Sequence, residues 1–208
     1  MPLDRTAHIL ETALWRFSLQ ALHLTTTAEI ARHAGVSNGT LFRLFPTKED
    51  LLDNVYAYAM SQLQQPLLAG PGAPQRGEHL TKLLQRWWHL PAQVALAQPH
   101  VFAFWRLYRH AARSAAQPTV LLGPFESVGG LIERALARNT WSRTKPLPVP
   151  LMVAALAGQW TAALDLVLTD PACQADASLR QLVLERAYAG WWQGLGLSDY
   201  LEVELVPR

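Results

Sequence analysis

The stretch that decides the fold runs from Thr25 to Val55, TTTAEIARHAGVSNGTLFRLFPTKEDLLDNV. Thr26 followed by Glu29 predicts a helix start, because the hydroxyl can accept one free backbone N–H and the carboxylate can reach back to another. Gly35 predicts the end of that helix, since glycine adopts the left-handed backbone of a C-cap without strain. Ser37 then predicts the cap of a second short helix.

A third helix start follows closely. Pro46 ends the second helix, and Thr47 with Asp50 opens the third as Thr-Lys-Glu-Asp. The side chains expected to be buried are Ile30, Ala31 and Ala34 in the first helix and Leu41, Leu44 and Phe45 in the second. Two short helices joined by a tight glycine turn predict a helix-turn-helix, whose second helix fits the major groove of DNA.

These same residues resemble a known family. From Thr25 to Leu51 the order is T-T-x-x-E-I-A-x-x-A-G-V-S-x-G-T-L-F-x-x-F-P-x-K-E-x-L, which resembles the tetracycline-repressor (TetR) family of bacterial transcriptional regulators. The resemblance is close over about the first quarter of the chain. In the rest of the chain, only the arrangement of the expected helices is similar. It implies a homodimer with a DNA-binding head and a helical body that binds a small-molecule effector.

Eight residues are expected to contact DNA, because they lie at helix starts or on the second helix: Thr26, Ser37, Asn38, Gly39, Thr40, Phe42, Arg43 and Lys48. Arg43 is the long basic side chain there, and guanine is the usual bidentate partner of arginine. Phe42 stands where the family usually has Tyr, and Asn38 where it often has Lys or Arg. Helix capping alone explains Thr26 and Ser37 equally well.

The composition limits the class of protein. The 208 residues suffice for one medium domain or for a small domain plus a larger one, and half of them are hydrophobic, which favours a well-filled core. We expect no membrane span, because no apolar run reaches about 18 residues, and no signal peptide, because no basic segment precedes an apolar one. The single Cys173 cannot form an internal disulfide, which suits the cytoplasm.

The charge of the presumed DNA-binding segment is low. The whole chain carries a formal net charge of +2, and residues 1–60 hold five Lys/Arg against six Asp/Glu. Non-specific attraction to phosphates is therefore modest for one subunit, so dimerisation and helix N-termini must supply more of the affinity.

Helical periodicity, interrupted by Pro and Gly, predicts an all-α chain. The expected parts are a helix-turn-helix domain at 1–47, a linker helix at 48–65, a Pro- and Gly-rich break at 66–77, and a helical effector-binding and dimerisation domain at 78–200. Helices of that last domain are expected at 78–90, 92–97, 99–115, 124–139, 148–169 and 176–194. Residues 201–208, LEVELVPR, resemble an expression-tag remnant.

Aromatic residues with a few polar neighbours concentrate after residue 86. The candidates for ligand binding are Trp87, Trp88, Phe102, Trp105, Tyr108, Arg109 and Trp160. One interpretation is an apolar cavity in which these groups orient a small apolar or aromatic effector. The other is ordinary core packing, which is favoured for any single residue, whereas the family resemblance favours a cavity for the group.

The segment 151–168, LMVAALAGQWTAALDLVL, is apolar on nearly every side, so burial on several faces is expected. Together with 176–194 it resembles the paired helices through which the family forms a four-helix dimer interface. A two-fold dimer also matches the recognition of a near-palindromic DNA site.

Enzymatic motifs are missing from the sequence. There is no Glu-x-x-His pair, no Gly-x-Ser-x-Gly elbow and no glycine-rich phosphate loop, so no catalytic residue and no cofactor are expected. The seven His lack i, i+4 spacing, which argues against a metal site. We expect a cytoplasmic, homodimeric repressor that an effector releases from its operator. The alternative is a helical ligand-binding or adaptor protein with weak or lost DNA binding, which the neutral head, Phe42 and Asn38 would favour.

Overall fold

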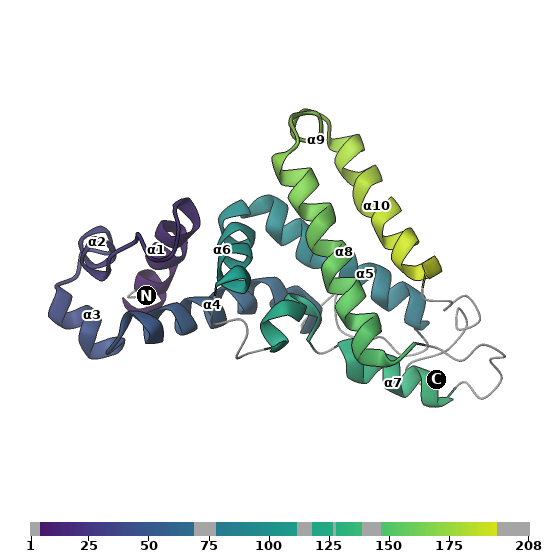
Figure 1. Ribbon diagram of the computed structural model, residues 1–208, viewed down its shortest axis with the longest axis horizontal. Helices are drawn as coiled ribbons and strands as arrows, with labels where there is room; N and C mark the ends of the chain where they lie inside the picture. The colour runs from purple at the N-terminus through teal and green to yellow at the C-terminus, as the bar shows by residue number, and fades with distance from the viewer. Residues whose placement is uncertain (1–4, 69–77, 112–117, 127, 139–146, 195–208) are drawn as a thin grey trace. The chain divides into compact units, whose positions relative to one another are not determined.

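The computed structural model describes residues 5–68, 78–111, 118–126, 128–138 and 147–194, and every regular element of these ranges is helical (Figure 1). The all-α prediction is therefore confirmed. The described residues divide between two compact units. Residues 201–208, which we interpreted as a tag remnant, and most of the 66–77 break lie outside the described ranges.

The first unit contains α1 (Arg5–Leu19), α2 (Thr27–His33), α3 (Asn38–Leu44), most of α4 (Lys48–Leu68) and α6 (Pro99–His110). Its core takes Ile9, Ala13, Leu14 and Phe17 from α1, all with no exposed surface. Phe104 of α6 lies against Phe17, with ring centroids 6.1 Å apart. Helix α6, expected in the second domain, therefore packs on the first helix of the head.

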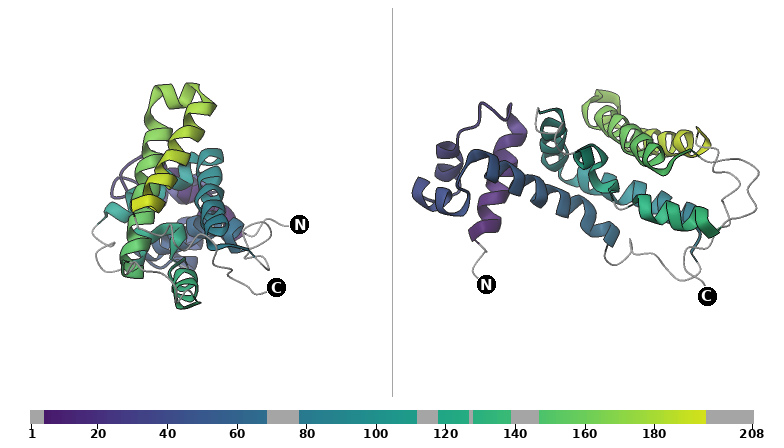
Figure 2. Two further views of the ribbon diagram at one scale, coloured as in Figure 1. Left: turned by 90° about the vertical axis from the view of Figure 1, so that its right-hand side faces the viewer. Right: turned by 60° about the horizontal axis from the view of Figure 1, so that its bottom comes forward.

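In its described residues, the second unit contains the end of α4 and six further helices. These are α5 (Leu80–Ala97), the 3-10 helix η3 (Pro118–Phe125), α7 (Val128–Arg138), α8 (Val149–Thr169), α9 (Pro171–Ala175) and α10 (Ala177–Gly194). Helices α8 and α10 lie side by side and are joined through α9, as Figures 1 and 2 show. The Trp191 indole donates to the carbonyl of Met152 across this pair at 3.2 Å.

Helix α5 differs from the prediction. We expected a break at Pro91, but one helix runs through it from Leu80 to Ala97. Proline removes one backbone hydrogen bond, to the carbonyl of Trp87. Trp87 and Trp88 before the proline and Ala92 after it are all buried, so packing on both sides outweighs the local cost.

Helix α8 also corrects an expectation. It is 21 residues long and apolar enough to cross a membrane by length and composition, although we expected no such segment. Half of its most apolar window is buried inside the second unit. Such burial is typical of a core helix, and it agrees with the expected burial of this segment on several faces.

Candidate nucleic-acid interface

Helix α2 and the turn after it form as the residue types predicted. The Thr26 hydroxyl accepts a hydrogen bond from the backbone N–H of Glu29 at 3.2 Å. The Glu29 carboxylate, expected to reach back to Thr26, instead forms an ion pair with Arg16 of α1. Gly35 has φ +65°, and the N–H of Val36 donates to the carbonyl of Ala31 at 3.0 Å, so the helix ends in a left-handed cap.

Helix α3 is capped at one end and anchored at the other. Ser37 accepts from the N–H of Thr40 at 3.1 Å, and the two hydroxyl oxygens lie 3.0 Å apart. Leu41 and Phe45 are buried, and Phe45 leaves the helix with extended backbone before Pro46. The buried side fixes the helix against the head, which leaves the opposite side for a partner.

The exposed side of α3 presents Asn38, Gly39, Phe42 and Arg43. Their spacing of one, three and one residues puts them on one helical face. Phe42 is 44% exposed. Leu44, which we expected in the core, is 40% exposed, because Leu41 and Phe45 fill the inner positions of this short helix.

The start of α4 lies beside the helix-turn-helix in the sequence and is capped twice. The N–H of Thr47 donates to Asp50 Oδ2, and the N–H of Asp50 donates to Thr47 Oγ1, both at 3.0 Å. Lys48 begins the helix, and its Nζ donates to the carbonyl of His23 at 3.4 Å. Partial burial lowers the pKa of Lys48, and Glu49 opposes that shift.

The electrostatics of the head remain near neutral. Arg16 is engaged with Glu29, so it adds little free positive charge. Local desolvation, followed by the charges of Arg16 and Arg32, lowers the pKa of His33 and favours its neutral form. Arg32 and Arg43 are exposed cations of the α2–α3 segment. The affinity for a polyanion must therefore come from a few placed contacts and not from bulk charge.

Four of the seven predicted ligand residues lie on α6, in the first unit. Phe102 and Trp105 pack with ring centroids 5.6 Å apart, and the Arg109 guanidinium lies 4.9 Å from the Trp105 centroid. The Tyr108 hydroxyl donates to Asp53 Oδ1 of α4 at 2.7 Å, and its ring stacks on Tyr56 at 4.8 Å. The sequence did not indicate this link between α6 and α4, because 55 residues separate its partners.

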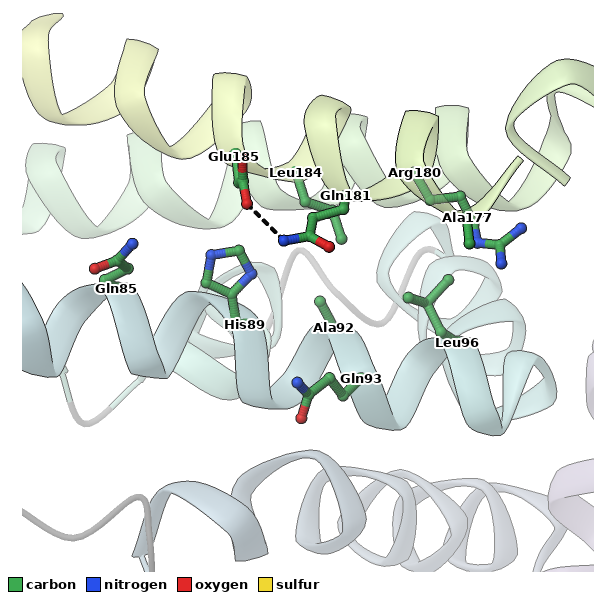
Figure 3. A pocket seen from close by; sticks show the side chains of 10 residues that line it. All are labelled: Gln85, His89, Ala92, Gln93, Leu96, Ala177, Arg180, Gln181, Leu184 and Glu185. Atoms are coloured by element: carbon green, nitrogen blue, oxygen red, sulfur yellow. Dashed lines mark hydrogen bonds between the residues drawn. The ribbon is translucent and has the colours of Figure 1, made fainter. Parts of the chain in front are cut away.

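The other three predicted ligand residues, Trp87, Trp88 and Trp160, lie in the second unit and are buried. The Trp160 indole donates to the carbonyl of Trp88 at 3.1 Å, and Phe125 meets the Trp160 ring edge-on at 5.4 Å. The seven residues thus divide between the two units, and their role in ligand binding stays a prediction. A groove between α5 and α10 is lined by none of them (Figure 3).

Helix α8 carries an exposed apolar stripe. Its exposed members are Leu151, Ala154, Ala155, Gly158, Ala162 and Leu166. They recur every three or four residues, so they share one face of the helix. Leu151 and Leu166 at the ends are 57% and 48% exposed. A Cβ added to Gly158 would meet nothing within 4 Å, so the middle of the stripe is open.

The capped, surface-presented α3 after a glycine turn defines a helix-turn-helix protein. Residues 9–55 match the family of bacterial regulatory proteins named tetR. The HTH-type transcriptional regulator LuxR of Vibrio harveyi is 39% identical over 61 residues, which cover 29% of this chain and 30% of LuxR. This chain thus spans under a third of that curated relative.

Solved structures extend the likeness to nearly the whole chain. A crystal structure from Shewanella sp. PV-4, described as a tetR family transcription regulator, is similar at a TM-score of 0.74 with 28% identity, covering 92% of this chain and 98% of that one. The fatty acid degradation regulator FadR of Bacillus halodurans shares the fold at a TM-score of 0.68 with 15% identity, covering 92% and 96%. The family match over residues 9–55 and these structural likenesses together support assignment of the chain to the TetR family.

Proposed function

We propose that this protein is a sequence-specific DNA-binding transcriptional regulator, acting in the bacterial cytoplasm. The observation that carries the proposal is the exposed face of α3, where Asn38, Gly39, Phe42 and Arg43 lie together on a helix anchored by Leu41 and Phe45. A helix presented in this way can enter the major groove and read base edges. Thr26 and Lys48 begin the neighbouring helices, where backbone N–H groups and the ammonium can hold phosphates.

The regulator acts as a homodimer in this proposal. The stripe from Leu151 to Leu166 on α8 supports it, because an exposed apolar face on a long buried helix favours association with a second apolar surface. Two copies related by a two-fold axis present two α3 helices to a near-palindromic operator. Dimerisation also compensates for the low charge of one head.

We further propose repression that a small-molecule effector relieves. Support comes from α4, a continuous helix whose first residues follow the helix-turn-helix and whose last residues belong to the second unit. A ligand that binds one arrangement of α4 more tightly than another increases the population of the arrangement that it prefers. The size of that shift is set by the difference between its two affinities, and the operator affinity changes with it. The small apolar or aromatic effector expected from the sequence stays a prediction, since the rings that suggested it are packed against neighbours.

The test is made in the bacterium that encodes the chain. DNA crosslinked to the full-length protein is sequenced, and transcripts are compared between the wild type and a deletion strain. Reproducible sites sharing one motif, with flanking genes that rise on deletion, are the expected result for a repressor. Flanking genes that fall would indicate an activator. A protein that is expressed and folded but enriches no shared site would contradict the proposed DNA-binding function.

A further inference from the structure

The groove between α5 and α10 has a volume of about 540 Å³, within the range of small-molecule sites. Helix α5 contributes Gln85, His89, Ala92, Gln93 and Leu96, and α10 contributes Ala177, Arg180, Gln181, Leu184 and Glu185. Both sets recur every three or four residues, so each is one helical face. Near Glu185, the Tyr188 hydroxyl donates to the carbonyl of Thr81 at 3.2 Å and ties the two helices together.

The groove carries a positive side chain at one end and a negative side chain toward the other. Figure 3 shows Arg180 at one end, and Glu185 opposite His89 toward the other. One guanidinium nitrogen of Arg180 donates to the carbonyls of Cys173 and Gln174, both at 2.9 Å, which fixes the side chain at the end of α9. Among the residues that the structure describes, no carboxylate lies within ion-pair distance of Arg180.

The carboxylate of Glu185 is also held by a hydrogen bond. Its Oε1 accepts a hydrogen bond from Gln181 at 2.8 Å, and within the described ranges no cation forms an ion pair with it. His89 faces it from α5 (Figure 3). Burial lowers the pKa of His89, against the opposing effect of Glu185, so the imidazole does not neutralise the carboxylate at neutral pH. Among the described residues, the groove thus holds one cation and one anion that have no ion-pair partner.

The groove between the two charges is lined by apolar side chains together with the amides of Gln93 and Gln181. Ala92 and Leu184 are buried there, 1% and 5% exposed, and Leu96 lies toward the Arg180 end (Figure 3). Glu185 follows Arg180 by five positions along α10, a rise of about 7.5 Å. A bound molecule would therefore meet a cation, a mixed surface that includes Ala92 and Leu184, and an anion in succession.

We propose that this groove binds a short linear zwitterion, with its carboxylate at Arg180, its aliphatic chain over Ala92 and Leu184, and its ammonium at Glu185. The site lies wholly within the second unit, so the proposal is independent of DNA binding. Charge-assisted hydrogen bonds at both ends supply orientation, and the spacing between them selects the chain length.

The test is isothermal titration calorimetry of the full-length protein, without DNA, with 6-aminohexanoate. Hexanoate and hexylamine, which each keep one charge, serve as comparison probes. We expect 6-aminohexanoate to bind roughly tenfold more tightly than either, as one charge-assisted hydrogen bond would give. Equal binding of the three probes, or no saturable binding to folded protein, would overturn the proposal.

Two variants separate the two ends. Glu185→Gln should bring 6-aminohexanoate down to the affinity of hexanoate, and Arg180→Gln should bring it down to that of hexylamine. Ala177→Trp, an exposed position at the Arg180 end, should block the groove while keeping the Arg180 contacts to α9. Arg186→Gln, exposed on the same helix outside the groove, is the matched control and should bind like wild type. Uniform losses in all four variants would indicate general destabilisation and overturn the assigned ends.

Discussion

Arg43 is the residue on which we propose that sequence readout depends most. It is exposed near the end of α3, so its guanidinium can reach a guanine without disturbing the core. Arg43→Ala should weaken binding to a selected operator by about 1–3 kcal/mol, or roughly 5- to 150-fold. The melting temperature should hardly change, because exposed substitutions usually alter stability by less than about 0.5 kcal/mol.

The measurement is fluorescence anisotropy on labelled operator, with differential scanning calorimetry beside it. Arg134→Ala, which removes an exposed arginine of α7 in the second unit, is the control and should leave the affinity unchanged. Equal affinities for Arg43→Ala and wild type would remove Arg43 from the readout.

Gly39 offers a test in which stability and binding move in opposite directions. A Cβ added there would meet only Ser37 Oγ, at 3.9 Å, so the free protein can accept alanine. Gly39→Ala should raise the unfolding free energy by up to about 1 kcal/mol through helix propensity. It should weaken operator binding, because the added methyl group occupies the face that we propose approaches DNA. A variant that is more stable and binds normally would show that the backbone of Gly39 does not approach the duplex closely.

The turn between α2 and α3 sets the orientation of the recognition helix. Gly35 has φ +65°, a conformation that costs other L-residues about 1–2 kcal/mol. Gly35→Ala should therefore lower the unfolding free energy by roughly that amount, measured by denaturant titration. Gly39→Ala, the neighbouring glycine with ordinary helical backbone, is the natural control of opposite sign. No loss of stability in Gly35→Ala would mean that the turn relaxes to another conformation.

Local sequence signals predict some helices of this protein and miss others. The helix-turn-helix was predictable because its caps are local: Thr26, Gly35 and Ser37 act within three or four residues. The course of α5 was not, because burial on both sides of Pro91 decides it. The groove between α5 and α10 was not predicted either. The polar residues at 85, 89 and 93 on a largely apolar helix were a signal that could have indicated it.

The placement of the aromatic residues could not be predicted from the sequence, for the same physical reason. Trp105 and Trp160 are both ring-packed and buried, but they belong to different units. Composition cannot distinguish a buried ring that fills a core from one that lines a cavity. The pairing of Tyr108 with Asp53 depends on the return of α6 to the head, which no local pattern encodes.

The assembly of the whole molecule can be tested at Gly158. The position is open in the folded chain, so Gly158→Trp should fold normally but obstruct a second copy on the α8 stripe. Sedimentation velocity should show a shift from dimer to monomer, with loss of binding to a two-half-site operator. Glu133→Trp, an exposed position on α7, controls for an added aromatic surface. An intact dimer in Gly158→Trp would place the interface elsewhere.

The central claim, that a dimer reads DNA through α3, is tested most directly by selection from random duplex DNA. The purified full-length protein is mixed with the pool, and the retained DNA is sequenced. The predicted result is an enriched near-palindrome whose half-site centres lie about one helical turn, or 10–10.5 base pairs, apart, or a multiple of it. No enrichment by protein that is folded and dimeric would contradict the claim and favour a helical ligand-binding protein without operator recognition.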